Sequence, residues 1–317
     1  MPQIKDIGEI GLIKRITRPP KDKAILVGIG DDAAVVQTKE GFQVLTTDCL
    51  VEGDHFRNDW FTPEQIGMKA IEINVSDVAA MGGRPKFALV SLVLPNDLQV
   101  DFFDRIYDGM WKACDRNSLE IIGGNMAHGN FIVISITLIG EIEGNNCTLR
   151  KGAQPGDSLF VSGCLGNGRA GLRAYQNNLQ GFNKTKNKYL EPKARLAYAL
   201  KIAPYAHAMI DISDGLASEI RHICNQSHLG ANIFLDQIPI NDEVREIARI
   251  LGENEYDYAL YGGEDFELLY AVSEENFQHV KGIFIGKIIN SPEIKLIYND
   301  SEEEIKRTGY DHFSNDF

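Results

Sequence analysis

The chain has 317 residues, and its composition of 44% hydrophobic and 24% charged residues is ordinary for a globular protein. The formal net charge is −13 and no compact stripe of Lys and Arg is present, which argues against a nucleic-acid partner. No apolar segment is long enough to span a bilayer, and the charged N-terminus lacks a signal-peptide core, so we expect no membrane partner.

The five cysteines include no C-x-x-C pair, which predicts reduced thiols and a cytoplasmic location rather than a disulfide framework or a zinc site. The length predicts two domains, because a domain averages about 150 residues. The turn-rich stretch 150–157 marks the junction best. We therefore expect an N-terminal domain over residues 1–145 and a C-terminal domain over residues 146–317.

The N-terminal half predicts a mixture of helices and strands. Apolar residues at helical spacing mark a first helix that a Pro-Pro pair ends, and Thr62-Pro63 begins a second. Asn74, Ser76 and Asp77 lie inside that second helix, where a polar side chain either faces water or has a specific role. The expected elements are helix 5–16, two strands within Val27–Phe56, helix 62–81, strand Phe87–Leu94, helix 100–117, and strands Glu120–Ile122 and Phe131–Ile142.

The second half alternates strands and helices, which predicts an α/β or α+β fold. In order, we expect strand Ser158–Ser162, a glycine loop and a helix, a polar loop over Asn177–Lys188, helix 193–203, strand 208–213, helix 215–227, strand 231–236, helix 242–251, and strands 266–272, 283–289 and 294–299.

The glycine loop Gly166–Gly171 fits G-x-G-x-x-G and follows a strand, so a dinucleotide site has to be considered. Such a site requires a second strand that ends in an acidic residue about 20 positions further on. A lysine-rich stretch occupies that region instead, and no P-loop motif occurs anywhere in the chain. The pattern therefore does not favour a dinucleotide-binding domain.

Acidic residues recur at strand ends and in turns. Ordinary turn or helix-capping chemistry is the alternative, and it explains Asp214 better than Asp211. Oxygen ligands without His or Cys select Mg²⁺, Mn²⁺ or Ca²⁺ over zinc, and such a set suits phosphoryl transfer. The acidic residues concerned are Asp31, Asp32, Asp48, Asp77, Asp211, Asp214, Glu264 and Asp265.

Six motifs then carry a family resemblance along nearly the whole chain: GIGDDAA, TTDCLVEGDHF, NVSDVAAMGG, DISDGLAS, GGEDFELL and GYDHF. Together they resemble the thiamine-monophosphate kinase family, in the superfamily of aminoimidazole ribonucleotide synthetase and selenophosphate synthetase. The resemblance implies ATP-dependent phosphorylation of thiamine monophosphate to thiamine diphosphate, with several Mg²⁺ ions. It also implies a two-domain aminoimidazole ribonucleotide synthetase-like fold, with an N-terminal α/β domain that pairs in a homodimer and a C-terminal α+β domain.

The resemblance assigns roles to single residues. It makes His55 and Glu264 contacts of the thiamine phosphate. It places Tyr107, Gly124, Arg150 and Ser213 at the ATP. The implied magnesium ligands are Asp31, Thr46, Thr47, Asp48, Asp77, Asn125, Asp211 and Asp214, with Asp32 behind them. No general base is implied, because a phosphate monoester is already ionised near neutral pH.

Two positions depart from the family pattern. Many members have Gly-Gly-Asp where this chain has Gly-Gly-Asn125, and an Asn oxygen can bind Mg²⁺ but adds no charge. Members often place an aromatic residue shortly before GYDHF, where this chain has Arg307 and Thr308. Stacking on the thiamine rings would then fall to Tyr310 or Phe313.

Two rival functions remain. One is another ATP-dependent synthetase of the superfamily, although residues 1–48 lack the cysteine of selenophosphate synthetases and the chain does not end in the cysteine of hydrogenase-maturation members. The other is a catalytically impaired nucleotide- or metal-binding homologue, which Asn125 suggests. Production of thiamine diphosphate from ATP and thiamine monophosphate distinguishes the kinase from both.

Overall fold

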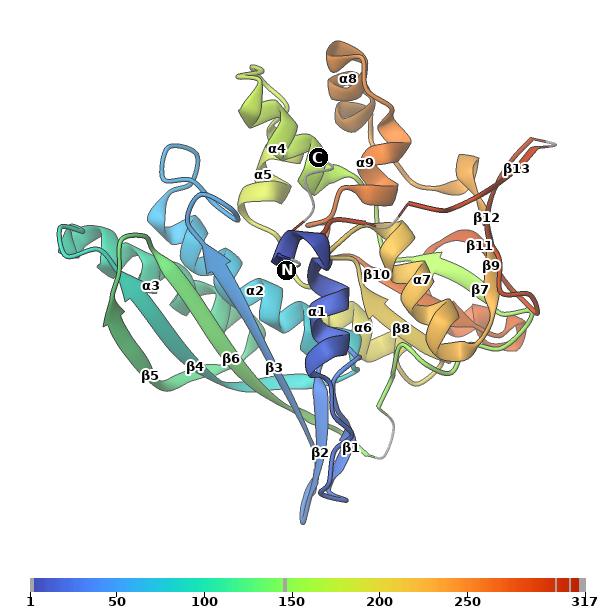
Figure 1. Cartoon of the computed structure of the whole chain (residues 1–317), viewed down its shortest axis with the longest axis horizontal. Helices are drawn as coiled ribbons and strands as arrows, with labels where there is room; N and C mark the ends of the chain where they lie inside the picture. The colour runs from blue at the N-terminus through green and yellow to red at the C-terminus, as the bar shows by residue number, and fades with distance from the viewer. Residues whose placement is uncertain (1–2, 145–146, 300, 308, 314–317) are drawn as a thin grey trace.

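The computed structural model describes residues 3–144, 147–299, 301–307 and 309–313. These residues form two β-sheets with helix α2 (Pro63–Ala80) between them (Figure 1). The six-stranded sheet has the order β1-β2-β3-β6-β4-β5, and the seven-stranded sheet has the order β13-β12-β9-β11-β7-β10-β8. The expected mixed α/β architecture is confirmed.

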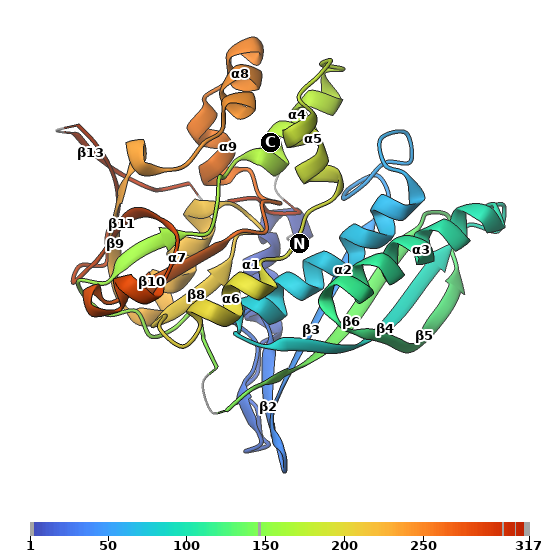
Figure 2. The same cartoon turned by 180° about the vertical axis from the view of Figure 1, so that it is seen from behind.

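The six-stranded sheet is antiparallel except for the pair β4 and β5. Helices α2 and α3 (Val100–Asn117) cover one face of it, as Figure 2 shows. Val44, Leu50 and Ile136 point into the core that these helices close. The strands are β1 (Ile25–Val27), β2 (Ala34–Thr38), β3 (Gly41–Val51), β4 (Arg84–Leu94), β5 (Glu120–His128) and β6 (Val133–Ile142).

Helix α2 joins the two halves of the protein. Thr62 caps it and Pro63 is its first residue, as the sequence predicts, because Pro lacks the N–H that would be unpaired there. Most of its length is buried, including the polar Lys69 and Ser76. Its C-terminal Ala79 and Ala80 pack against side chains of the second sheet. The residues of α2 therefore contact both halves.

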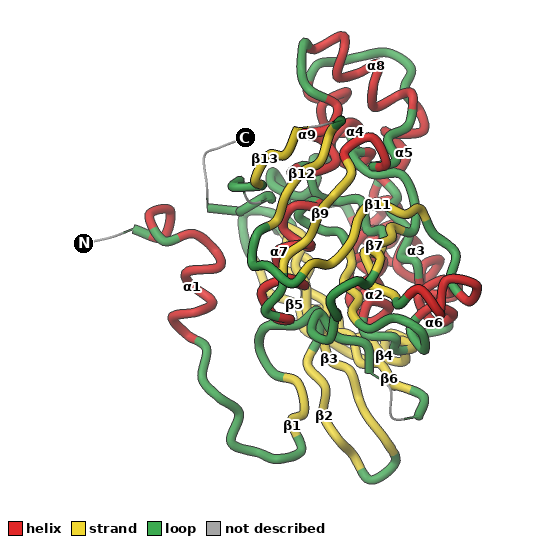
Figure 3. The backbone as a smooth tube through the Cα atoms, turned by 90° about the vertical axis from the view of Figure 1, so that its right-hand side faces the viewer, coloured by secondary structure: helices red, strands yellow, loops and turns green. Residues whose placement is uncertain are grey.

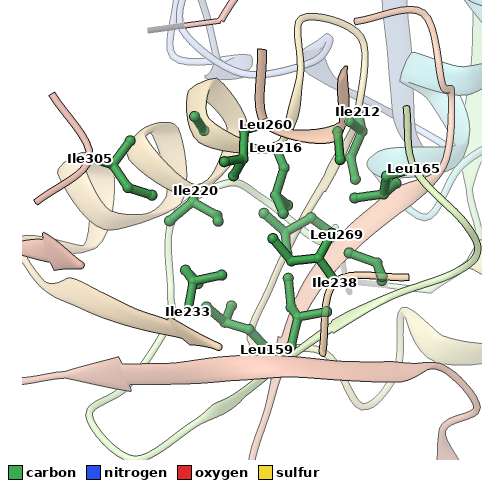
Figure 4. Close-up of a cluster of buried hydrophobic side chains, with 14 of the residues drawn as sticks. Leu159, Leu165, Ile212, Leu216, Ile220, Ile233, Ile238, Leu260, Leu269 and Ile305 are labelled. Atoms are coloured by element: carbon green, nitrogen blue, oxygen red, sulfur yellow. The ribbon is translucent and has the colours of Figure 1, made fainter. Parts of the chain in front are cut away.

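The seven-stranded sheet has its own core. Leu159, Ile233 and Leu269 from the sheet point toward Leu216 and Ile220 of α7 (Figure 4). Within this sheet, β9 and β12 are the one parallel pair among the described strands. The elements are β7 (Ser158–Val161), α4 (Asn167–Gln176), α5 (Asn183–Leu190), α6 (Leu196–Ile202), β8 (Ala208–Asp211), α7 (Leu216–Ser227), β9 (Gly230–Phe234), η2 (Leu235–Gln237), α8 (Asp242–Leu251), α9 (Glu255–Tyr261), β10 (Leu268–Val272), η3 (Glu274–His279), β11 (Ile283–Ile289), β12 (Ile294–Tyr298) and β13 (Ser301–Glu304).

Several local predictions were wrong. The second half of the expected loop Asn177–Lys188 is helix α5, whose Thr185 and Tyr189 are buried by tertiary packing that its polar sequence does not reveal. Strand β5 continues to His128, because pairing with β4 carries it through two glycines. Helix α9 and strand β13 were not predicted. The predicted boundary between residues 145 and 146 lies outside the described residues.

Helix α1 (Gly8–Ile16), after the short turn η1 (Ile4–Asp6), stands at the edge of the molecule (Figure 3). The backbone N–H of Glu9 donates to the carboxylate of Asp311 at 3.1 Å. This contact ties the start of α1 to the C-terminal segment. Across the part of the chain that the structure describes, no helix is both long and apolar enough to cross a membrane.

Candidate active site

Three carboxylates from distant parts of the chain meet at one buried point. Asp32 precedes β2, Asp77 lies near the end of α2 and Asp211 ends β8, and each has an oxygen within 4.8 Å of the others. One oxygen of Asp32, Oδ2, is buried and has no hydrogen-bond partner among the described residues. A buried carboxylate oxygen without a donor is costly, so this cluster fits a divalent cation with oxygen ligands.

Neighbouring side chains hold the three carboxylates in place. The Thr46 hydroxyl donates to Asp77, and the Ser76 hydroxyl donates to Asp211, both at 2.6 Å. The guanidinium of Arg150 donates to Asp32 Oδ1 at 2.5 Å. Thr46 and Asp77 are predicted ligands that the structure brings together. Arg150, predicted as an ATP contact, here neutralises part of the acidic cluster.

Asp31 lies beside this cluster without belonging to it. Its carboxylate accepts the backbone N–H of Arg150 at 3.2 Å. The predicted order of importance, with Asp31 in the site and Asp32 behind it, differs from the geometry, in which Asp32 meets Asp77 and Asp211. Adjacent residues point in different directions, and the sequence alone does not show which of the two carboxylates turns inward.

Burial controls the protonation of these groups. Loss of solvation, followed by the nearby Asp211 carboxylate, raises the pKa of Asp77 well above its usual value. Burial likewise raises the pKa of Asp211 to about 8 and that of Asp31 to about 6. Carboxylates this close cannot all ionise near neutral pH unless a cation offsets their repulsion. A bound cation would let the three carboxylates of the cluster ionise together.

A cavity of about 250 Å³ contains a second group of predicted residues. Burial raises the pKa of Asp48 and raises that of Asp214 to about 6. Acidic residues from both halves of the chain line this cavity, so it is an acidic pocket at their junction. Predicted residues that line it are Asp48, His55, Ser213, Asp214 and Glu264, and Tyr310 and His312 join them from the C-terminal segment.

The loop that carries Ser213 and Asp214 is held by a residue that the sequence analysis missed. The buried carboxylate of Glu219 accepts the backbone N–H groups of Ser213 at 3.2 Å and Asp214 at 2.8 Å. Gly215 has a φ of 109°, a backbone conformation that residues with a side chain rarely adopt. An acid one turn into the helix after DISDG is the sequence signal that could have indicated Glu219.

His55 is oriented by the backbone. The N–H of Val51 donates to its Nδ1 at 3.1 Å, which leaves the proton of the neutral ring on Nε2. Burial lowers the pKa of His55, so the ring is neutral near pH 7. Its ring lies 4.9 Å from that of His312, and His312 contacts Asp54 at 3.3 Å. The C-terminal segment thus forms one wall of the cavity.

Four predicted residues lie elsewhere. Thr47 turns to the opposite face of β3 and donates to the Ile136 carbonyl, so its side chain is directed away from Asp48. Tyr107 is half-buried on α3 between the rings of Phe103 and Trp111. The other two, Gly124 and Asn125, lie on strand β5.

Strand β5 is separated from the acidic residues by the width of the sheet. Asp48 is in register with Ile136, Val90 and Gly124 on successive strands. Three strand spacings of about 4.8 Å put β5 about 14 Å from Asp48. Asn125, one residue further, faces the opposite side of the sheet. Within one chain, Asn125 does not reach the carboxylates.

The backbone N–H groups of the glycine loop bind a carboxylate of the same chain. The backbone N–H groups of Gly166 and Gly168 donate to the buried Asp265 at 2.6 and 3.1 Å. A Cβ on Gly168 would lie 2.6 Å from the Glu264 carbonyl oxygen, so this glycine permits close packing of the two loops. The G-x-G-x-x-G pattern therefore joins α4 to the Glu264 loop.

Family models and named relatives match most of the chain. Residues 30–142 match the N-terminal domain model of AIR synthase related proteins, and residues 154–299 match the C-terminal domain model. The thiamine-monophosphate kinase of Aquifex aeolicus (strain VF5) is 40% identical over 87% of this chain and 89% of that protein. The thiamine-monophosphate kinase of Bacillus subtilis (strain 168) is 34% identical over 96% and 99%.

Solved structures show the same relation. AaThiL complexed with AMPPCP and TMP superposes with a TM-score of 0.89 at 36% identity, covering 98% of this chain and 99% of that one. The hydrogenase maturation protein HypE of E. coli has a TM-score of 0.70 at 18% identity, over 83% and 85%, and shares the fold alone. The chain belongs to the thiamine-monophosphate kinase family, among the AIR synthase related proteins.

Proposed function

We propose that this protein transfers the γ-phosphoryl group of ATP to the phosphate of thiamine monophosphate, which yields thiamine diphosphate and ADP. The observation that carries the proposal is the cavity between the two halves, where Asp48, His55, Asp214 and Glu264 meet beside the buried Asp32 cluster. Support also comes from AaThiL, a relative by structure whose complex holds AMPPCP and TMP.

Magnesium is the cation that fits the acidic residues. Asp32, Asp77 and Asp211 would hold it in the buried cluster, and Asp48 and Asp214 would hold it at the cavity. Bound Mg²⁺ would neutralise charge between the two polyanionic substrates. Thr46 supports Asp77 through its hydrogen bond, and Asp31 accepts the backbone N–H of Asp32 at 3.1 Å.

The side chains of the protein bind and orient the substrates. The neutral ring of His55 presents an Nε2–H donor suited to a phosphate oxygen. Glu264 and Tyr310 line the same cavity and suit the organic part of thiamine. No group has to remove a proton, because the acceptor phosphate is already ionised. Catalysis then rests on positioning and charge neutralisation.

A second copy of the chain would supply the missing part of the nucleotide site. Gly124 and Asn125 lie on the exposed edge strand β5, far from Asp48 of the same chain. An edge strand can pair with another chain. We therefore infer a homodimer through the N-terminal sheets, with Gly124, Asn125 and Tyr107 at the ATP. Light scattering of the purified protein tests this, and a monomer that is fully active would contradict it.

The activity is tested by incubating the protein with ATP, Mg²⁺ and thiamine monophosphate and separating the products by chromatography. We expect ADP and thiamine diphosphate in equal amounts, and strongly reduced turnover by Asp48→Asn. ATP binding without thiamine diphosphate at any Mg²⁺ concentration would instead indicate the impaired homologue. A cytoplasmic location stays part of the proposal, supported by five free cysteines and by the use of ATP.

A further inference from the structure

Lys69 is a buried lysine directly beneath the candidate substrate contacts. Its residue exposure is 0%, although a buried ammonium is costly unless it is paired. Its Nζ lies 2.6 Å from Oε1 of Glu264 and donates to the backbone carbonyl of His55 at 3.1 Å. The rings of Tyr189 and Phe61 lie 4.7 and 5.3 Å from Nζ. A carboxylate, a backbone carbonyl and two aromatic rings therefore surround this buried ammonium.

The two oxygens that Lys69 binds come from different halves of the chain. His55 follows β3 of the N-terminal sheet, and Glu264 precedes β10 of the second sheet. Both line the cavity, whereas Lys69 is not among the described residues that line it. One ammonium on helix α2 thus bridges the two walls of the cavity without lining the cavity itself.

The Glu264 backbone is also in a demanding conformation. Its φ is 59°, in the left-handed region that residues other than glycine seldom adopt. Its backbone N–H donates to the Ser213 carbonyl at 2.7 Å. The main chain of Glu264 is fixed in this way, and the Lys69 contact fixes the direction of its side chain. An unpaired Glu264 carboxylate would also repel an approaching phosphate.

We propose that Lys69 is a positioning residue for the phosphate-bearing substrate. It holds the Glu264 carboxylate and the His55 loop at the geometry that thiamine monophosphate requires, and it cancels the charge of Glu264. This inference rests on the proposed function, because it takes His55 and Glu264 as the substrate contacts. Pre-organisation of this kind improves binding by removing the cost of ordering the site when the ligand arrives.

The test is Lys69→Met, which keeps the length of the side chain but removes its charge. We expect the KM for thiamine monophosphate to rise about 10- to 100-fold, the range set by losing a hydrogen bond to a charged group. The KM for ATP should change less than about twofold, because Lys69 contacts no predicted ATP residue. Calorimetric binding of thiamine monophosphate with AMPPCP present should weaken by the same factor.

Lys188→Met is the matched control. Lys188 also pairs with a buried carboxylate, that of Glu267, at 2.9 Å, and Glu267 keeps its second partner Arg195 in the variant. Loss of this pair should lower the melting temperature without moving the KM for thiamine monophosphate. If both lysine variants raise that KM equally, the Lys69 effect is general destabilisation and the proposal is wrong.

A double-mutant cycle with Glu264→Gln completes the test. If Lys69 acts through Glu264, the fold-increase in KM of the double variant should be far smaller than the product of the fold-increases of the two single variants. Independent, multiplicative effects or an unchanged KM in Lys69→Met would overturn the positioning role while the wild-type activity stands. Lys69→Gln, which keeps a donor for the His55 carbonyl, replaces the Met variant if that one does not fold. An inactive wild type would contradict the proposed function itself.

Discussion

Replacing Asp77 with Asn should stabilise the metal-free protein while weakening its response to Mg²⁺. Asp77 has an oxygen within 4.8 Å of carboxylate oxygens of both Asp32 and Asp211. At that distance and an effective dielectric constant of about 20, each ionised pair repels by about 3.5 kcal/mol. Fully ionised, Asp77 would therefore suffer about 7 kcal/mol of repulsion from its two neighbours.

In the metal-free protein these carboxylates avoid most of this repulsion because they stay protonated. The substitution therefore removes only the part of the repulsion that remains. We expect Asp77→Asn to raise the free energy of unfolding in EDTA at pH 8 by about 1 to 3 kcal/mol. Asn has nearly the same shape, and its oxygen can still accept the hydrogen bond from the Thr46 hydroxyl. Packing at the end of α2 should therefore be unchanged.

The assay is urea unfolding in EDTA and in excess Mg²⁺, for wild type and variant. Mg²⁺ should raise the unfolding midpoint of the wild type and raise that of Asp77→Asn by less, because binding to the folded state alone stabilises it and the variant lacks one carboxylate of the buried cluster. Kinase turnover should fall by orders of magnitude in the variant. A variant that is less stable than wild type in EDTA, and that Mg²⁺ stabilises as much as it stabilises the wild type, would refute the reasoning about this cluster.

Three further predictions concern the same site. Folded Asp31, Asp214 and Asp211 keep protons up to a pKa of about 6, 6 and 8, whereas an unfolded Asp releases them near its usual value of 3.8. Unfolding below these pKa values releases protons, so the stability of the metal-free protein should fall from pH 5 to pH 8. The rise in Tm caused by Mg²⁺ should grow over the same range, because protons compete with Mg²⁺ for the carboxylates. An equal rise in Tm at pH 5 and pH 8 would contradict this. Tyr310→Ala should raise the KM for thiamine monophosphate and Phe313→Ala should not, because only the first of these two residues lines the cavity. Asn125→Asp should lower the Mg²⁺ concentration needed for half-maximal activity, and an unchanged requirement would remove that residue from the metal site.

Much of the site can be predicted from local sequence alone. Asp211 stands where an apolar strand ends, Asp48 interrupts a strand and Asp77 interrupts a buried helix, so each conflicts with its local environment unless it has a function. The motif order then identifies the family, which the comparisons confirm. The fold class follows from alternating strand and helix patterns, because those periods are properties of short segments.

The partnerships within the site depend on tertiary structure. Lys69 looks like any helical lysine until the loop bearing Glu264 packs over it. Asp32 rather than Asp31 meets the other carboxylates, because the backbone between adjacent residues turns one inward. The register of the sheet places Asn125 on the far side from Asp48. Contacts between distant segments follow from the packing of α2 between two sheets, and no local pattern encodes that packing.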